Sequence, residues 1–219
     1  TTLDTRITRN THRGKRVKRT RQIDTRSTLD IATAHRSADT TLSTTPDTNG
    51  LQDVYRWSRA TNTTAIVSVT STGVQGDGDA TGCTINADGR YVAFLSDAPN
   101  LVAGDTNGVV DVYRKDLQTG RLERVSTTSS GAQIAEASSE LSMSGDGRYI
   151  IFSNRNDTIF PRSHSNGVYD DVFIKDMDTG TLKLVSDFPL ARESYQSLGA
   201  TISADGRWIV LKSSATEPG

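Results

Sequence analysis

The amino-acid sequence predicts an all-β protein of about three repeated units, each with four short antiparallel strands, as in the blades of a β-propeller. The first observation is a repeat. NADGRYVAFLS at residues 86–96 recurs as SGDGRYIIFSN at 144–154 and as SADGRWIVLKS at 203–213. The second is a set of Asp-Gly, Asn-Gly and Thr-Gly turn signals between short apolar runs. The third is that no segment shows the 3.6-residue periodicity of an amphipathic helix.

A second motif recurs in step with the first. It reads DTNGLQDVY at 47–55, DTNGVVDVY at 105–113 and HSNGVYDDVF at 164–173. Its asparagines, like the turn glycines of the first motif, are 58 and 59 residues apart. Because both motifs keep one spacing, the repeat indicates a recurring structural unit.

The strands of each unit follow one another in a fixed order. The first is expected to end near Ile85, Met143 or Ile202, where an Asp-Gly hairpin turns the chain into the second. A longer connection ends in Asn-Gly and leads to a third strand, such as DVYRKDL at 111–117. A Thr-Gly turn then leads to a fourth, such as RLERVS at 121–126.

The second strand of each unit is apolar on both of its alternating faces, as in YVAFL at 91–95 and YIIF at 149–152. A sheet with one wet face needs only one apolar face. The pattern therefore indicates sheets stacked face to face.

The repeats occupy residues 46–219, in units of about 47–104, 105–163 and 164–219. Closed propellers typically have four to eight blades. We therefore expect either a piece of a larger propeller or a propeller completed by a second chain. Open blade edges would let such a piece self-associate.

Residues 1–45 differ from the repeats in composition. They hold 13 Thr, 10 Lys or Arg and 4 Asp, but no aromatic residue. Such a segment cannot bury a blade's worth of apolar surface. We expect an irregular leader, which is either a poorly packed tail or the product of a shifted reading frame.

The segments SxDGRYVAFxS, DTNGxxDVYxxDxxTG and RVS closely resemble the WD40-like (PD40) repeats of bacterial TolB-like β-propellers, over residues 47–219. The resemblance implies a propeller fold and an exported setting, in the periplasm or at the cell surface. Because such propellers host many functions, the resemblance is specific for the fold and not for one function. Our leading interpretation is a non-catalytic module that binds or scaffolds a protein or glycan partner. The alternative is the propeller portion of a larger enzyme, such as a prolyl-oligopeptidase-like peptidase or a propeller lyase, with its catalytic part outside this chain.

The candidate metal ligands are side-chain oxygens of the D-x-N-G-x-x-D loops. Two repeats place them at positions 1, 3 and 7 around a glycine: Asp47, Asn49 and Asp53, and then Asp105, Asn107 and Asp111. This is the early part of a Ca²⁺ loop, and two carboxylates with one amide predict weak binding, about 10⁻⁴ to 10⁻³ M. In the third repeat His164 replaces the first aspartate, so that copy should bind badly.

A structural role explains the same loops. Asn-Gly favours a positive φ, the preceding aspartate can cap the turn, and the last aspartate can accept backbone N–H groups where the strand begins. The neighbouring acidic stretch GDGDATG at 76–82 is expected to be a solvated loop. The sequence leaves both roles open for the D-x-N-G-x-x-D loops.

No catalytic motif is present: the sequence has no G-x-S-x-G elbow, no H-E-x-x-H and no phosphate-binding G-x-x-x-x-G-K-[ST]. Arg90, Arg148 and Arg207, which each follow an Asp-Gly turn, are expected to pair with nearby acids. The basic run at 12–19 lacks interleaved aromatic residues, so specific nucleic-acid binding is not expected. No run of 18 apolar residues predicts a membrane span.

Overall fold

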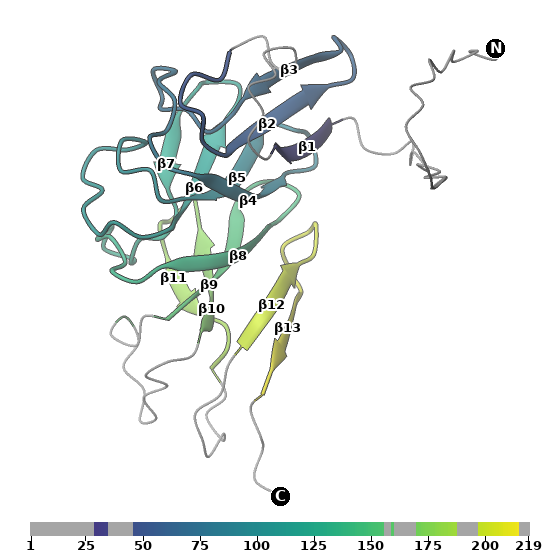
Figure 1. Cartoon of the computed structure of the whole chain (residues 1–219). Coiled ribbons are helices and arrows are strands. Elements are labelled where there is room, and N and C mark those ends of the chain that lie inside the picture. Colours follow the sequence, from purple (N-terminus) through teal and green to yellow (C-terminus); the bar gives the residue numbers. More distant parts are fainter. Residues whose placement is uncertain (1–28, 35–45, 156–158, 160–169, 188–196, 215–219) are drawn as a thin grey trace, which may run out of the picture.

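The computed structural model describes residues 29–34, 46–155, 159, 170–187 and 197–214, and the strands that these residues form are grouped in four antiparallel sheets (Figure 1). The first sheet has the order β1 (Leu29–Ala34), β2 (Asp53–Ser58) and β3 (Thr63–Ile66). The second comprises β4 (Ala80–Ile85), β5 (Tyr91–Ser96), β6 (Asp111–Asp116) and β7 (Leu122–Arg124). The third comprises β8 (Ser138–Met143), β9 (Tyr149–Asn154), β10 (Asp171–Asp176) and β11 (Leu182–Leu184). The fourth pairs β12 (Ser197–Ile202) with β13 (Ile209–Ser213).

The four-stranded sheets have the strand order that the turn signals predict. The first strand of a unit ends at Ile85, Met143 and Ile202, as expected. Each such strand is hydrogen-bonded to the strand after the Asp-Gly turn, as β4 is to β5 and β12 is to β13. Each complete sheet also combines two strands from one sequence repeat with two from the next. In the second sheet, β4 and β5 belong to the repeat at 47–104, and β6 and β7 belong to the repeat that begins at residue 105.

Successive sheets stack on one another through their first strands. β4 contacts β8, and β8 contacts β12, so the first strands of successive sheets adjoin. The innermost strands of propeller blades have the same relationship. The chain is thus all-β, with the architecture of a partial propeller.

The second strands supply the core between sheets. Val92 and Phe94 pack toward the first sheet, in a cluster that contains Val54. Ala93 and Leu95 face the other way, in a cluster that contains Phe152 and other residues of the third sheet. The prediction that β5 has two buried faces is therefore confirmed, and the same alternation explains its uninterrupted apolar sequence.

The leader departs from the expectation at one place. Residues 29–34 form β1, which pairs with β2 from Leu29 opposite Ser58 to Ala34 opposite Asp53. The remaining leader residues, 1–28 and 35–45, lie outside the described part of the chain. None of the described segments forms a helix with the length and apolar character needed to cross a membrane.

A glycine contact joins the second and third sheets. Gly147 has φ +76°, and a Cβ placed on it would lie 2.5 Å from the ring of Tyr91. Its carbonyl accepts a 2.7 Å hydrogen bond from Arg114 Nη1, and the Arg114 guanidinium lies 4.6 Å from the centre of the same ring. The Asp-Gly turn therefore serves both the hairpin and the packing between blades.

Candidate functional site

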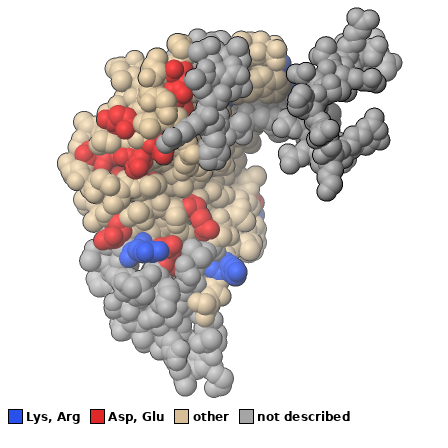
Figure 2. Space-filling view, viewed as in Figure 1, with Lys and Arg blue, Asp and Glu red and all other residues tan. Residues whose placement is uncertain are grey.

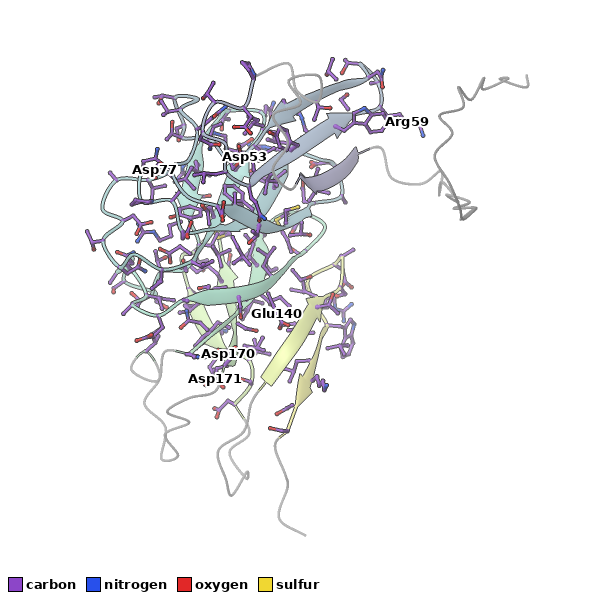
Figure 3. All side chains as sticks on the ribbon, in the orientation of Figure 1. Asp53, Arg59, Asp77, Glu140, Asp170 and Asp171 are labelled. Carbon is purple, nitrogen blue, oxygen red and sulfur yellow. The ribbon has the colours of Figure 1, made fainter. Side chains whose placement is uncertain are left out.

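The D-x-N-G-x-x-D loops lie at one end of the sheets. The register aligns Ala80, Ser96 and Asp111, so the start of β4, the end of β5 and the start of β6 meet there. We define the acidic loop end by five aspartates of the first two repeats: Asp47, Asp77, Asp79, Asp97 and Asp105. Figure 2 shows acidic side chains gathered on the upper left part of the visible face, and Figure 3 labels Asp53 and Asp77 in that upper part. The Asp-Gly and Thr-Gly turns lie at the opposite end of the strands, here called the hairpin end.

In each repeat a buried aspartate begins the third strand and binds a serine. Ser68 Oγ donates to Asp53 Oδ1 at 2.5 Å, Ser126 Oγ to Asp111 Oδ1 at 2.5 Å, and Ser186 Oγ to Asp171 Oδ1 at 2.7 Å. The serine oxygen in turn accepts the next backbone N–H, for example from Val112 at 3.1 Å. These serines belong to the repeated R-V-S or I-V-S-type segments, so this aspartate has a structural role in all three repeats.

In the second repeat the two predicted carboxylates converge on shared donors. Tyr113 Oη donates to Asp105 Oδ2 at 2.6 Å. Gln133 Nε2 reaches Asp105 Oδ1 at 3.0 Å and Asp111 Oδ2 at 3.2 Å. Asn107 Nδ2 also lies 3.3 Å from Asp111 Oδ2. The structure thus brings all three predicted residues of this copy together.

A guanidinium completes this cluster. Arg124 Nη2 lies 3.6 Å from Asp105 Oδ2, and Arg124 Nε lies 3.6 Å from Asp111 Oδ2. The Arg124 side chain is only 7% exposed. Burial raises the pKa of the Asp111 carboxyl, while Ser126 and the positive charge of Arg124 act in the opposite direction. The second copy therefore contains its own cation.

In the first repeat the turn role is visible directly. Asp47 Oδ1 accepts hydrogen bonds from the backbone N–H groups of Asn49 and Gly50, both at 3.1 Å. Asn49 Oδ1 accepts the N–H of Leu51 at 2.9 Å, and Asn49 Nδ2 donates to the Gly76 carbonyl at 2.8 Å. These bonds agree with the predicted Asx turn, in which the first aspartate caps the loop.

The last residue of this loop, Asp53, is less well satisfied. The residue is 1% exposed, and its Oδ2 atom is buried with no hydrogen-bond partner. Burial raises the pKa of its carboxyl, and the negative charges of Asp47 and Asp79 raise it further, against the effect of the Ser68 and Asn49 side chains.

The calcium assignment of both loops stays a prediction. Within the described residues, no three His, Cys, Asp or Glu side chains form a group that could hold a metal ion. His164 and Asn166 of the third copy lie outside those residues. Asp170, which precedes β10, is hydrogen-bonded by Arg155 Nε at 3.0 Å.

Arginines at the hairpin end pair with acids, as expected. Arg90 Nη2 lies 2.8 Å from Asp116 Oδ2, and Arg148 Nη2 lies 2.8 Å from Asp176 Oδ2. The prediction of paired arginines is confirmed for these two residues.

Two buried lysines on the third strands join consecutive sheets. Lys115 Nζ donates to the carbonyls of Val69 and Thr70, at 2.9 and 2.7 Å. Lys175 repeats this contact one sheet later. Sequence reasoning missed both, although the shared Lys-Asp at the end of DVYRKD and DVFIKD is a signal that could have revealed them.

Neither a family model nor a curated protein sequence matches the chain. Among solved structures, TolB from Acinetobacter baumannii is similar at 20% identity over 74% of this chain, with a TM-score of 0.45. The putative TolB from Agrobacterium tumefaciens is similar at 17% identity over 79%, with a TM-score of 0.46. The tricorn protease is similar at 12% identity over 74%, with a TM-score of 0.46.

The chain spans only part of these structures: 32% of the A. baumannii TolB chain, 53% of the A. tumefaciens protein and 13% of the tricorn protease. The propeller architecture of the chain rests on the strand order and the stacking of the sheets described above. The narrower assignment to PD40 repeats stays a prediction.

Proposed function

We propose that the chain is a non-catalytic β-propeller module that binds a protein partner through the acidic loop end. The observation that carries this proposal is the uneven pairing of charge between the two ends. At the hairpin end, arginines pair with acids through bonds of 2.8 Å. At the acidic loop end, the loops at 46–52, 74–80 and 96–110 carry five aspartates and neither lysine nor arginine. The side chain of one of the five, Asp105, is buried and lies 3.6 Å from Arg124 of β7, so the proposal depends on the other four.

The loops that carry these aspartates are tied to one another. Asn100 links two of them, because its Oδ1 accepts the N–H of Asp77 at 3.1 Å and its Nδ2 donates to the Gln75 carbonyl at 2.9 Å. Gln75 in turn accepts from Thr48 and donates to the Pro46 carbonyl at 2.7 Å. A surface held in this way loses little conformational entropy on binding.

The charge favours a basic segment of a protein as the partner. Asp77, Asp79 and Asp97 are exposed, so their charges are available to a ligand. Complementary charge accelerates association and selects partners, and it weakens as salt screens it. The proposed setting is the periplasm or the cell surface.

The test compares two triple variants in binding to a synthetic lysine-rich peptide. Asp77→Asn/Asp79→Asn/Asp97→Asn neutralises the acidic loop end. Asp88→Asn/Asp178→Asn/Asp205→Asn neutralises three acids near the hairpin turns and is the matched control. We expect the first to weaken binding by roughly tenfold or more at low salt and the second to change it by less than about twofold.

Equal losses in both variants would mean that only net charge matters and would contradict the proposed surface. A different outcome would assign a glycan partner: the chain would bind a neutral oligosaccharide but not the peptide, and the first variant would bind that oligosaccharide as well as the wild type does. Peptide hydrolysis by the purified chain would contradict a non-catalytic role.

A further inference from the structure

The first and second repeats carry the same loop, but they differ at the position that supplies the cation. Arg124 lies opposite Tyr113 in the β6–β7 pairing. The residue opposite Tyr55 in the β2–β3 pairing is Ile66, which is 8% exposed. The first repeat thus has a buried isoleucine where the second has the guanidinium that contacts both carboxylates.

The neighbouring glutamine also differs between the two repeats. In the second, Gln133 Nε2 donates to Asp105 and Asp111. In the first, the corresponding Gln75 Nε2 donates to the Pro46 carbonyl at 2.7 Å instead. The carboxylates of the first repeat therefore lack the amide donor as well as the guanidinium.

The first repeat carries an additional negative charge. Asp79 Oδ1 accepts the N–H of Gln52 at 3.0 Å, which places this carboxylate next to the loop, and its counterpart in the second repeat is Ala137. Asp47, Asp53 and Asp79 interact as like charges, whereas the second cluster balances two carboxylates with Arg124. Unbalanced charge around a buried carboxylate is costly unless a cation compensates it.

Asp53 identifies where that cation belongs. Its Oδ2 is the oxygen without a partner in a side chain that is 1% exposed, whereas the equivalent Asp111 Oδ2 accepts from Gln133 and lies beside Arg124. Asp53 Oδ2 is thus buried without a hydrogen-bond partner, at the position where its counterpart in Asp111 lies 3.6 Å from Arg124. Arg124 Nε is itself buried without a hydrogen bond, so its contact with Asp111 is one of charge.

We propose that the first repeat binds one calcium ion beside Asp47 and Asp53, in the place that Arg124 fills in the second repeat. The two carboxylates supply the charged ligands, and amide and backbone carbonyl oxygens of the loop, with water, complete the shell. Hard oxygen ligands of this kind suit Ca²⁺, and two carboxylates predict a dissociation constant of about 10⁻⁴ to 10⁻³ M. Arg124 correspondingly makes the second repeat independent of calcium.

This inference does not rest on partner binding. The proposed calcium ligands are Asp47 and Asp53. Asp47 also belongs to the acidic loop end, but the partner surface is tested at Asp77, Asp79 and Asp97, none of which is a proposed ligand. Loss of peptide binding and loss of calcium binding are therefore separable results.

The experiment measures calcium binding by the full chain with isothermal titration and follows the melting temperature in 10 mM CaCl₂, 10 mM MgCl₂ or EDTA. We expect calcium to raise the melting temperature of the wild type by roughly 2–5 °C and EDTA to reverse the change. Asp53→Asn, which keeps the size of the side chain, and Ile66→Arg, which installs the guanidinium of the second repeat, should each weaken calcium binding at least tenfold. Asp105→Asn is the matched control and should leave the response unchanged.

The reciprocal variant makes the test independent of a folding defect. Arg124→Ile gives the second repeat the composition of the first and should make its stability more dependent on calcium than that of the wild type. The proposal is overturned if the wild type does not respond to calcium, if magnesium acts equally well, or if Asp105→Asn abolishes the response while Asp53→Asn preserves it. If Ile66→Arg does not fold, the calcium affinity of Asp53→Asn alone tests the proposed site.

Discussion

Arg148 holds Asp176 through two parallel hydrogen bonds, from Nε to Oδ1 at 2.9 Å and from Nη2 to Oδ2 at 2.8 Å. Arg90 and Asp116 repeat the arrangement one sheet earlier. Two-point pairs of this kind fix orientation as well as charge. In each sheet the pair joins the start of the second strand to the end of the third, so it closes the hairpin end of the blade.

These pairs predict sensitivity to acid. The bonds from Arg148 hold the pKa of the Asp176 carboxyl well below its usual range, and Arg90 does the same for Asp116. The folded-state pKa of each aspartate lies below its unfolded-state pKa of about 3.9. The ion pairs therefore contribute their full stabilisation above about pH 3.9, and this contribution is lost as the pH falls from there toward the folded-state pKa. Thermal melts between pH 7 and pH 2 should show this loss below about pH 4. Asp176→Asn should lower the melting temperature by roughly 2–4 °C at pH 7 and flatten the acid dependence, and an unchanged profile would contradict the account.

Gly147 should be much less tolerant of alanine than Gly180. Both have a positive φ, +76° and +73°, so both substitutions carry a backbone cost of about 1 kcal/mol. Only at Gly147 would the added Cβ meet a ring, that of Tyr91 at 2.5 Å, whereas nothing lies within 4 Å at Gly180. Gly147→Ala should therefore destabilise the chain by about 1–3 kcal/mol more than Gly180→Ala, as measured by urea unfolding. Equal losses of stability in the two variants would show that the Tyr91 ring moves aside without destabilising the fold, and would contradict this prediction.

Lys175 should be needed for packing between the second and third sheets. Its Nζ donates to the carbonyls of Thr127 and Thr128 at 2.9 and 3.0 Å, and the residue is 4% exposed. Lys175→Met retains most of the apolar stem but leaves both carbonyls without this donor, which should cost about 1–3 kcal/mol. Hydrogen exchange should show faster exchange at the N–H groups of residues 126–131. Unchanged exchange there would mean that the lysine contributes nothing to this contact.

The outer face of the fourth sheet should promote self-association. Trp208 and Val210 are 69% and 68% exposed, unlike their buried or half-buried counterparts in β5 and β9. Within the described residues, β13 is hydrogen-bonded to β12 alone. Light scattering should therefore detect association that grows with concentration and that Val210→Lys reduces. A concentration-independent monomer would contradict this expectation.

Sequence patterns were sufficient for much of the fold because the signals are local. Asp-Gly turns placed strand ends at Ile85 and Met143, and the two apolar faces of β5 indicated burial between sheets. The role of Arg124 could not be read in the same way. It occupies a position that is Ile66 in the preceding repeat, and its partners lie 13 and 19 residues away in sequence. The β1 strand was missed because no glycine-bounded strand pair marks it within the Thr- and Arg-rich leader.

The most direct test of the proposed function is to map the bound peptide on the chain. Amide chemical shifts would be followed by NMR while the lysine-rich peptide is added at low salt. We predict that the shifts concentrate in the loops at 46–52, 74–80 and 96–110, with little change at the Asp-Gly turns. Shifts concentrated at the hairpin end, or no shifts at saturating peptide, would contradict the assignment of the acidic loop end as the binding surface.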